Sequence, residues 1–341
     1  MSALTPTLGF LAFSADVGAK PEWVQGAGGN TSEKDGEVIW VKASGTLLSE
    51  ARDRSIFLPL RLGTLRSNFE QGIDDAQSAC LDPISSLRPS IESALHAALQ
   101  HRVVVHTHAV DVIAHAARRD AEAILARKLE GLDWAFVPYA RPGLPLARAM
   151  RGASAGSPRI YVLANHGLVV GSDDVEGAAA LLHTVEQRLA ADIPSFPAPA
   201  IDRLREVAAG TEWVLPMFDE SHALAFSPSR ERVCAGALYP DHVVFIGPGP
   251  VPTVPIEHLS RFLRASPAPY PALVVSPDFG VLLRKDATKG AHEMARCLAL
   301  VSLRVDQSAE LAYVGAEQEQ ELLSWDAETY RQALERARSR N

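Results

Sequence analysis

A short apolar run ends in two histidines separated by one residue, and the type and spacing of these residues could support chemistry. Residues 103–105 are three valines, which predict a buried strand, and His106 and His108 stand at its end. Side chains at positions i and i+2 of a strand point to the same side, so both imidazoles face one place. A second apolar run, residues 159–164, leads to His166 just before a glycine.

Three neutral imidazoles are enough to hold a catalytic zinc ion that keeps one coordination position open for water or substrate. A single histidine on an apolar run is more often a core residue than a ligand. A pair at one strand end with a third histidine at another favours the metal. The sequence therefore predicts a zinc site formed by His106, His108 and His166, and the same ligands would also suit Mn²⁺ or Co²⁺.

A helix that could carry an acid or base lies shortly before the histidine pair. Pro89 and Ser90 suit a helix start, and the apolar residues that follow fall on one face at helical spacing. Glu92 in the first turn has two interpretations, a solvated carboxylate that favours the helix dipole or a group close to the metal. The short spacer to His106 makes the second plausible. His96, one turn further, is expected to be structural or to support the site rather than to bind the ion.

Two turns of small residues flank a predicted strand at 38–41 and could bind an anion. The first turn, residues 25–32, contains three glycines beside Asn30, and backbone N–H groups in such a loop can face an anion. The second turn, residues 42–45, adds the ammonium of Lys42 and a serine hydroxyl. Neither turn fits the GxGxxG or Walker A motif, which argues against a dinucleotide or nucleotide site.

Three further polar residues, in a loop and on a helix, are possible site residues. Residues 136–143 form a predicted strand that runs into a loop of proline and glycine, in which Tyr139 and Arg141 could reach a substrate. A tyrosine beside a proline is about as often a packing residue. His183 lies on a predicted helix, away from any strand end, and is not expected to bind the metal.

The composition of the 341-residue chain argues against several classes of protein. Hydrophobic residues make up 47% and charged residues 22%, both typical of a folded globular protein. The net charge of −8 argues against a general nucleic-acid or anionic-membrane surface. Three widely spaced cysteines argue against a disulfide framework and favour the cytoplasm. Neither an export signal nor a membrane span is expected from the apolar stretches.

A proline-rich segment divides the chain into two predicted domains. Residues 193–200 contain three prolines and are expected to link a domain at 1–192 to one at 201–341. The second domain has no constellation of histidine, cysteine and glutamate comparable to that of the first, and no internal repeat stands out between the two halves. Its predicted elements are strands at 242–246, 272–276 and 280–283 and a helix at about 288–313.

With these residues in place, residues 3–192 resemble the class II aldolase/adducin family, which includes the L-fuculose- and L-rhamnulose-1-phosphate aldolases. Five short motifs match in the order in which the family has them. They are Gly29-Asn30-x-Ser32, Ala43-Ser44-Gly45, Pro89-Ser90-x-Glu92, His106-x-His108 and Asn165-His166-Gly167. The resemblance implies an α/β fold, an α/β/α sandwich with a central, mainly antiparallel sheet. Residues 201–341 resemble the C-terminal extension of longer members and are expected to form a smaller α+β domain.

The resemblance also implies roles for the matching residues. In the family the three histidines hold Zn²⁺, and a glutamate at the position of Glu92 serves as a further resting ligand or as the catalytic base. The positions expected to bind the substrate's anion are Gly29, Asn30, Ser44, Gly45 and Ser90, to which Lys42 adds a charge that the sugar-phosphate aldolases lack.

Two departures from the family pattern bear on the substrate and on the acid. Hydroxyls that line the phosphate pocket of the sugar-phosphate aldolases are replaced by Ala27 and Ile91, which leaves phosphate and carboxylate both open. The tyrosine acid of the fuculose enzyme has no counterpart at residues 109–131. Tyr139 or water is therefore expected to protonate the aldehyde oxygen.

The implied function is a metal-dependent aldolase that cleaves a hydroxyketone sugar, sugar phosphate or sugar acid through an enediolate. In that reaction Zn²⁺ stabilises the growing negative charge, and Glu92 moves the proton. The same site would suit a sugar-phosphate 4-epimerase or a 3-keto-acid decarboxylase, and a non-enzymatic, adducin-like scaffold is a further alternative. Relatives are tetramers, so we expect a homo-oligomer with a small-molecule substrate and with no nucleic-acid or membrane partner.

Overall fold

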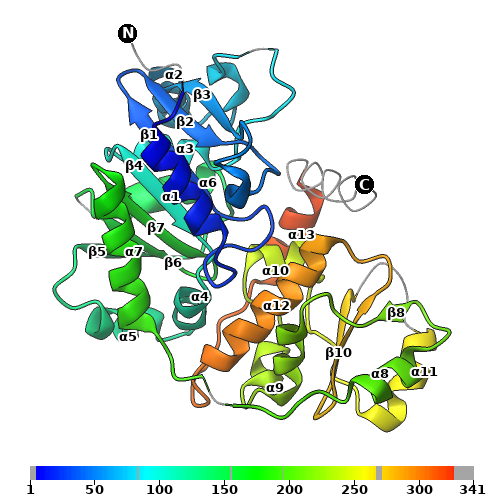
Figure 1. Cartoon of the computed structure of the whole chain (residues 1–341). Helices are drawn as coiled ribbons and strands as arrows, with labels where there is room; N and C mark the ends of the chain where they lie inside the picture. Colours follow the sequence, from blue (N-terminus) through cyan, green and yellow to red (C-terminus); the bar gives the residue numbers. More distant parts are fainter. Residues whose placement is uncertain (1–4, 83, 154–155, 194, 266–270, 326–341) are drawn as a thin grey trace. The chain divides into compact units, whose positions relative to one another are not determined.

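Contacts between Cα atoms divide the chain into two compact units (Figure 1). The structure is a computed structural model, and it describes residues 5–82, 84–153, 156–193, 195–265 and 271–325. The first unit comprises Met1–Val112 and Glu122–Ala190, and the second comprises Ile113–Ala121 and Ala191–Asn341.

A seven-stranded sheet forms the centre of the first unit. Its strand order is β3-β2-β1-β4-β7-β6-β5, and every neighbouring pair is antiparallel except β5 and β6, which are parallel. The strand that carries the histidine pair, β4, therefore lies in the middle of the sheet and is hydrogen-bonded on both sides. The strands are β1 (Asn30–Asp35), β2 (Val38–Lys42), β3 (Phe57–Arg61), β4 (Val103–Thr107), β5 (Trp134–Val137), β6 (Ile160–Leu163) and β7 (Gly167–Ser172).

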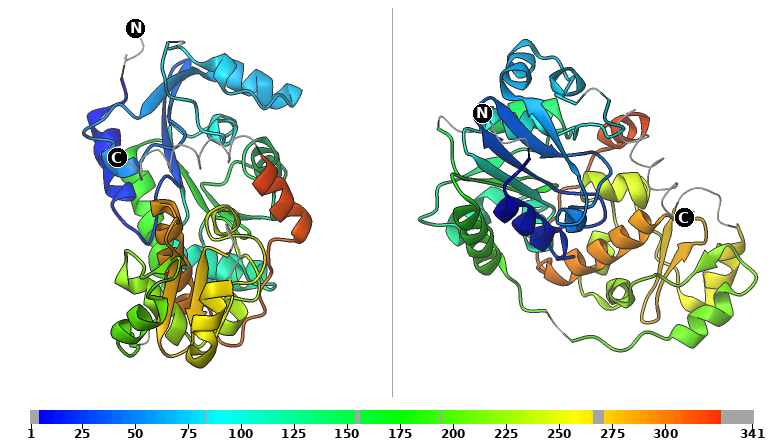
Figure 2. Two further views of the ribbon diagram at one scale, coloured as in Figure 1. Left: turned by 90° about the vertical axis from the view of Figure 1, so that its right-hand side faces the viewer. Right: turned by 45° about the horizontal axis from the view of Figure 1, so that its top comes forward.

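Helices cover both faces of this sheet. On one face α1 packs beside α7, and α7 packs against β4 and β7, as Figure 1 and the right-hand view of Figure 2 show. On the other face α3 packs against α2 and α6. The predicted α/β/α sandwich with a mainly antiparallel sheet is thus confirmed. The helices up to residue 190 are α1 (Leu8–Gly18), α2 (Leu62–Gln71), α3 (Ser93–Ala98), α4 (Val110–Ala116), α5 (Ala121–Lys128), α6 (Leu144–Gly152) and α7 (Val175–Leu189), with short 3-10 helices η1 (Leu48–Glu50) and η2 (Gln77–Ala79).

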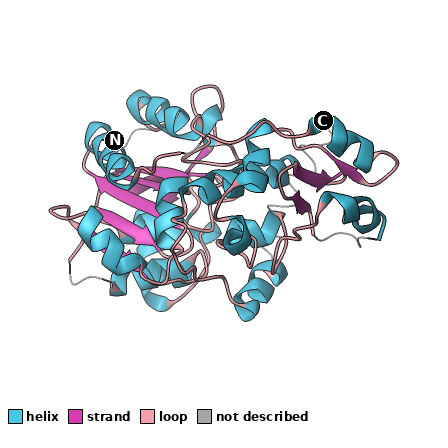
Figure 3. Cartoon of the chain, turned by 90° about the horizontal axis from the view of Figure 1, so that it is seen from below, coloured by secondary structure: helices cyan, strands magenta, loops and turns pink. Residues whose placement is uncertain are grey.

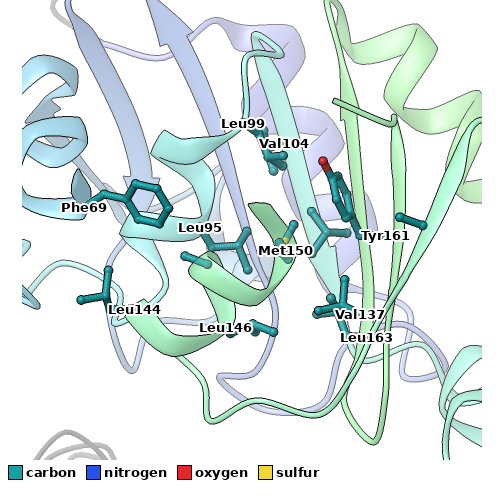
Figure 4. Packing of buried hydrophobic residues seen from close by; sticks show 13 residues of the cluster. Phe69, Leu95, Leu99, Val104, Val137, Leu144, Leu146, Met150, Tyr161 and Leu163 are labelled. Carbon is teal, nitrogen blue, oxygen red and sulfur yellow. The ribbon is translucent and has the colours of Figure 1, made fainter. Parts of the chain in front are cut away.

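An apolar cluster fixes α3 and α6 on the sheet (Figure 4). It includes Leu95 of α3, Leu146 and Met150 of α6, and Val104 and Tyr161 of the strands. Burial of such side chains is the main favourable contribution to folding. Because α3 is held in this way, the loop that precedes it is also held close to the end of β4.

All residues of β4 are buried, including its polar C-terminal end. The register places Asn30 of β1 opposite His106 on one side and Val169 of β7 opposite it on the other. The first histidine of the pair is therefore held by a backbone with neighbours on both sides, and a site built there has little freedom to move.

The second unit contains its own small sheet, which Figure 3 shows separately from the larger one. Its antiparallel strands have the order β8-β10-β9, and the expected α+β character of this part is confirmed. None of the helices in the described part of the chain has the length and apolar character needed to cross a membrane. The elements are α8 (Ile201–Ala208), β8 (Trp213–Val214), η3 (Asp219–Phe226), α9 (Arg230–Val233), α10 (Pro240–Phe245), α11 (Ile256–Ala265), β9 (Leu273–Ser276), β10 (Gly280–Arg284), α12 (Lys289–Arg304) and α13 (Ala316–Ser324).

Two element predictions for the second half were wrong. The β-branched residues at 242–246 predict a strand, but they follow Pro240, which lies in the first turn of α10 and has a φ suited to a helix. The helix predicted at about 288–313 ends at Arg304. Shortly beyond it the carboxylate of Asp306 accepts from the backbone N–H of Ser308 over 2.7 Å, which favours a turn.

The predicted domain boundaries, 1–192, 193–200 and 201–341, stay predictions, and residues 194 and 326–341 lie outside the described residues. The contact grouping adds a detail that a linear division lacks. Residues 113–121 belong to the second unit, where Arg119 donates its backbone N–H to Glu310 and Ala117 accepts from Ala312.

Leu146 tests the core that holds α3 and α6. Its side chain is 1% exposed, so Leu146→Ala removes buried methyl groups and leaves a cavity. We expect the free energy of unfolding to fall by about 2–5 kcal/mol in urea denaturation. Leu8→Ala, at a position that is 84% exposed, is the matched control and should change it by less than about 0.5 kcal/mol. Equal losses in the two variants would contradict this core.

Candidate metal centre

Three histidines from two separate parts of the first unit meet at one place. His106 and His108 come from the end of β4, and His166 comes from the turn between β6 and β7. The ring centroids lie 5.0, 4.9 and 5.1 Å apart. One possible ligand nitrogen from each ring lies within 4.8 Å of the other two, and all three side chains are buried. The convergence that a three-histidine metal site requires is therefore present.

The turn that delivers His166 is tight and has two special backbone positions. Gly167 pairs with the last residue of β6, so residues 164–166 form a three-residue connection. Asn165 has a φ of 53°, a left-handed conformation that asparagine tolerates better than most residues. A Cβ at Gly167 would lie 2.2 Å from the backbone oxygen of Thr107, so only glycine lets β7 start this close to the histidine strand.

A hydrogen bond to the backbone fixes the orientation of His106. Its Nδ1 lies 3.0 Å from the carbonyl oxygen of Leu168, which can only accept, so Nδ1 carries the proton. Nε2 is then left with a lone pair, and it faces Glu92. Metal-binding histidines usually make this kind of second hydrogen bond, because it sets the tautomer and the ring orientation.

Glu92 faces two of the histidines from the loop before α3. Its Oε1 lies 3.6 Å from Nε2 of His106 and 3.7 Å from Nε2 of His166. Both separations exceed hydrogen-bonding distance, and within the described residues this buried oxygen has no hydrogen-bond partner. Such an oxygen is costly to bury. The separations are short enough for one cation to reach all three atoms at about 2.1 Å each, so the site fits a divalent cation.

The charge state of Glu92 follows from its surroundings. Burial raises its pKa, but electrostatic interactions with His106, His166 and His108 and a hydrogen bond from Asn30 lower it, to about 2 overall. The side chain is therefore a carboxylate at neutral pH. Its negative charge beside three imidazoles favours a cation between them.

A chain of buried polar residues holds the second oxygen of Glu92. Asn30 donates to Oε2 over 2.7 Å, which leaves its own Oδ1 facing Nε2 of His96. Because that oxygen can only accept, Nε2 carries the proton, and Nδ1 accepts from Oγ of Ser32 at 2.7 Å. Burial and the nearby charge of Lys34 lower the pKa of His96 to about 3, so the ring stays neutral. His96 supports the carboxylate rather than facing the centre.

The glycine-rich loop lies against the strand that carries the histidines. A Cβ at Gly28 would come within 2.9 Å of Nδ1 of His108, and one at Gly29 within 2.9 Å of the backbone oxygen of His106. Gln25 also donates to the backbone oxygen of His108, over 3.3 Å. The absence of side chains at these two glycines therefore allows the loop to close over the site.

Four of the six residues predicted to bind an anion lie in or beside the loop that carries Glu92. Ser44 donates its backbone N–H to the carbonyl oxygen of Arg88 over 2.9 Å, which brings the turn with Ser44 and Gly45 against the loop that carries Ser90. Oγ of Ser90 lies 3.4 Å from Nδ2 of Asn30. Ser90 thus lies in the loop that positions the carboxylate of Glu92, and Asn30, Ser44 and Gly45 lie beside that loop.

Lys42 lies in the same region but its ammonium has other partners. Nζ donates to the carbonyl oxygen of Ala27 over 2.7 Å and to that of Thr46 over 2.9 Å, and the side chain is buried. These bonds join the two small-residue turns and give Lys42 a structural role. Its contact with an anion stays a prediction.

Tyr139 and His183 occupy different parts of the first unit. Tyr139 is half-buried and lies two residues beyond β5. Since β5 and β6 are parallel, the chain leaves them toward Tyr139 and His166 at the same edge of the sheet. The role of Tyr139 as an acid stays a prediction. His183 lies on α7, where its Nδ1 is 3.2 Å from a carboxylate oxygen of Glu186 and its side chain is 53% exposed.

Some residues that build this centre had no role in the sequence-based prediction. Asn165 could have been recognised, because asparagine directly before a glycine-ended turn often takes a positive φ. The contact between Ser32 and His96 could not, because it joins residues 64 positions apart. No local pattern encodes such a pairing.

Each comparison with known proteins matches about half of this chain. Residues 11–192 match the family model described as "Class II Aldolase and Adducin N-terminal domain". A curated protein from Bacillus subtilis (strain 168), named "Uncharacterized oxidoreductase YuxG", is 33% identical over 166 residues, which cover 44% of this chain and 24% of that protein. The alignment thus spans about a quarter of that relative's length.

Similar solved structures match about half of this chain. The N-terminal class II aldolase domain of a conserved protein from Thermoplasma acidophilum has a TM-score of 0.47 and 26% identity, and the match covers 55% of this chain and 95% of that one. A sugar-phosphate aldolase from Thermotoga maritima has a TM-score of 0.42 and 14% identity, with 53% and 90% covered. L-fuculose-1-phosphate aldolase from Thermus thermophilus has a TM-score of 0.37 and 17% identity, with 53% and 89% covered.

Removal of one imidazole tests the metal centre. His106→Ala or His166→Ala leaves two imidazoles, and we expect either variant to lose nearly all bound divalent metal in elemental analysis. His183→Ala, which changes an exposed histidine outside the centre, should retain the wild-type metal content. Metal loss in the His183 variant, or retention in both of the others, would contradict the site.

The neutral state of His96 predicts a pH dependence of stability. In the unfolded chain His96 becomes protonated below about pH 6.5, whereas in the native state it stays neutral down to about pH 3. The free energy of unfolding therefore falls as the pH drops through this window. At pH 4.5 the loss is roughly 2–3 kcal/mol for this group. Urea denaturation of the metal-free protein at pH 7 and pH 4.5 measures it. His96→Gln should lose less stability by that amount, and an unchanged pH dependence would contradict the assignment.

Proposed function

The chain belongs to the class II aldolase and adducin family, and we propose that it is a metal-dependent aldolase that cleaves a carbon–carbon bond of a hydroxyketone. One observation carries the proposal. Among the described residues Oε1 of Glu92 has no hydrogen-bond partner, and it lies beside Nε2 of both His106 and His166 within a group of three convergent imidazoles. This donor set suits a divalent cation that keeps a position open for substrate.

The metal that we propose is Zn²⁺, with Mn²⁺ or Co²⁺ as alternatives that imidazole ligands also accept. When bound, such an ion supplies a Lewis acid that stabilises negative charge on the substrate's oxygens. The residues of the chain that would hold it are His106, His108 and His166, with Glu92 as a further resting ligand or as the catalytic base.

We assign proton transfer to Glu92. Asn30 donates to its Oε2, and Oε1 faces His106 and His166. In the direction of synthesis the carboxylate would take a proton from the carbon beside the ketone carbonyl through Oε1. In cleavage the same atom would take up a proton from solvent and give it to that carbon of the ketone fragment. In the direction of synthesis Tyr139 or water would protonate the aldehyde oxygen.

The substrate class that we propose is a small sugar, sugar phosphate or sugar acid. The neighbouring Ser44, Gly45 and Ser90 offer hydroxyl and backbone groups that would hold an anion at the far end of the substrate, with Gly29, Asn30 and Lys42 as the other proposed contacts. An anion held there would determine which bond lies at the metal. Assembly into a homo-oligomer belongs to the same proposal.

Product analysis tests the reaction class. The metal-loaded protein, incubated with candidate hydroxyketones, should give two carbonyl fragments, and the reverse reaction should join them. A single rearranged sugar would identify a 4-epimerase, and release of CO₂ from a 3-keto acid would identify a decarboxylase. Either outcome would replace the aldolase proposal, and a chain that retains no divalent metal would favour a scaffold.

Glu92→Gln tests the assigned proton transfer. The amide keeps the size of the side chain and cannot take up a proton, so the variant should retain its metal yet exchange the ketone fragment's proton with solvent about 10²–10⁴-fold more slowly. Exchange of deuterium followed by NMR measures this step. Glu186→Gln, a change of a half-buried glutamate on α7 outside the centre, should exchange at the wild-type rate. Wild-type exchange in Glu92→Gln would remove Glu92 from the mechanism.

A further inference from the structure

The second unit repeats the order of elements found in the second half of the first unit. In the first unit α3 leads to β4, and α6, the hairpin of β6 and β7, and α7 follow later. In the second unit α8 leads to β8, and α11, the hairpin of β9 and β10, and α12 follow later. The sheet orders correspond as well, β4-β7-β6 in one and β8-β10-β9 in the other.

The strand register agrees residue by residue. The paired strands relate residues 213–214 to 104–105, 273–276 to 160–163 and 280–284 to 167–171. Extended along the chain without insertion or deletion, this numbering relates residues 201–217 to 92–108 and residues 256–285 to 143–172. The pairs Val104–Gly171 and Val105–Val170 of the first unit become Trp213–Arg284 and Val214–Leu283 in the second, and Tyr161–Val169 becomes Val274–Leu282.

The two hairpins also share an unusual turn. Each has three residues between the closing pair, and the middle one has a positive φ, 53° at Asn165 and 63° at Asp278. Within the described residues these are the two non-glycine positions with positive φ. The third turn residue donates its backbone N–H to the end of the first strand in both, from His166 over 3.2 Å and from Phe279 over 3.1 Å.

The hydrophobic cores use corresponding positions. All eight buried residues of the second unit's cluster match residues of the first unit's cluster or of its margin. The helix after each hairpin also begins in the same way, with Asp174 or Thr288 accepting from the backbone N–H three residues on. The core pairs are Leu95 and Leu204, Ala98 and Val207, Leu99 and Ala208, Val104 and Trp213, Leu146 and Leu259, Met150 and Leu263, Tyr161 and Val274, and Val169 and Leu282.

The correspondence identifies what stands at the metal-site positions of the second unit. His106, His108 and His166 are replaced by Leu215, Met217 and Phe279, and Glu92 is replaced by Ile201. Leu215 and Phe279 pack against the unit's own apolar cluster. Met217 lies three residues beyond β8, which is an edge strand in the described sheet, and it is 61% exposed. No imidazole or carboxylate remains at these positions to hold a cation.

We propose that residues 201–304 are a second copy of residues 92–189, in which apolar side chains have replaced the metal ligands and the carboxylate. Of the two copies of this fold in the chain, only the first unit then has a metal centre. The second unit keeps the architecture of the domain without its chemistry. An origin unrelated to the first unit would not give the same register, turn and core positions together.

Metal stoichiometry of the natural chain gives the first test, and it rests on the proposed metal function. Metal-stripped protein titrated with Co²⁺ should bind about one ion per chain, and a variant with His106, His108 and His166 all changed to alanine should bind none. Tight cobalt binding that survives in this variant at one per chain would overturn the proposal, because the second unit would then hold a site. A natural chain that binds no cobalt would instead refute the proposed function.

Restoring the ligands gives a test that is independent of the first unit's activity. In the triple-alanine background, Leu215→His, Met217→His and Phe279→His should create a site for about one Co²⁺, seen as the visible absorption of a tetrahedral ion. The control carries Asp278→His in place of Phe279→His, which puts the same number of imidazoles one residue out of register. It should bind cobalt at least 10-fold more weakly.

The graft is judged on chains whose circular dichroism matches that of the background protein. If the triple change prevents folding, Met217→His with Phe279→His, which keeps Leu215 in the core, replaces it and should still bind Co²⁺ more tightly than its partner with Asp278→His. Folded grafts that bind cobalt no better than their controls would overturn the correspondence between the two hairpins.

Discussion

The burial of an ionised carboxylate among three imidazoles is the constraint on which the first unit depends. A charge taken out of water costs several kcal/mol unless it is paired and hydrogen-bonded. Glu92 has Asn30 on one oxygen, while its other oxygen faces His106 and His166 at 3.6 and 3.7 Å. Neither separation is a hydrogen bond, and a cation between these atoms would complete the centre. The same property that makes the carboxylate costly to bury makes the centre suited to binding a cation.

Rigid strands and a few permissive backbone positions meet this constraint together. The central strand β4 is fixed on both sides, so His106 and His108 cannot move apart. The approach of the other segments then depends on residues without a Cβ, Gly28 against His108 and Gly167 against Thr107. Preorganisation of this kind favours catalysis, because charges that form during a reaction meet groups that are already oriented.

The parts of the site that were predictable share a local period. The spacing of His106 and His108 reports a strand, and the apolar face of 91–99 reports the helix that Glu92 precedes. Contacts between distant residues were not predictable, such as the bond from Ser32 to His96. The partners of Lys42 were not predictable either. Its charge suggested that it binds an anion, but its ammonium donates to two backbone carbonyl oxygens. Tertiary context also overrode strand propensity at 242–246, where Pro240 begins a helix.

The resemblance between the two units escapes the sequence for a related physical reason. A core position needs an apolar side chain of fitting volume, so Val104 can correspond to Trp213 and Tyr161 to Val274 while the register stays the same. The residues that would reveal the relationship between the two units in the sequence are the metal ligands, and in the second unit these have been replaced. Replacing a buried polar cluster by apolar residues is often neutral or stabilising. Once a copy of the fold is released from holding an ion, Leu215 and Phe279 can join its core, and the requirement for charged and imidazole side chains disappears without loss of the architecture. On this proposal the second unit keeps the sheet and its helices with apolar side chains at the positions where the first unit has its ligands and carboxylate.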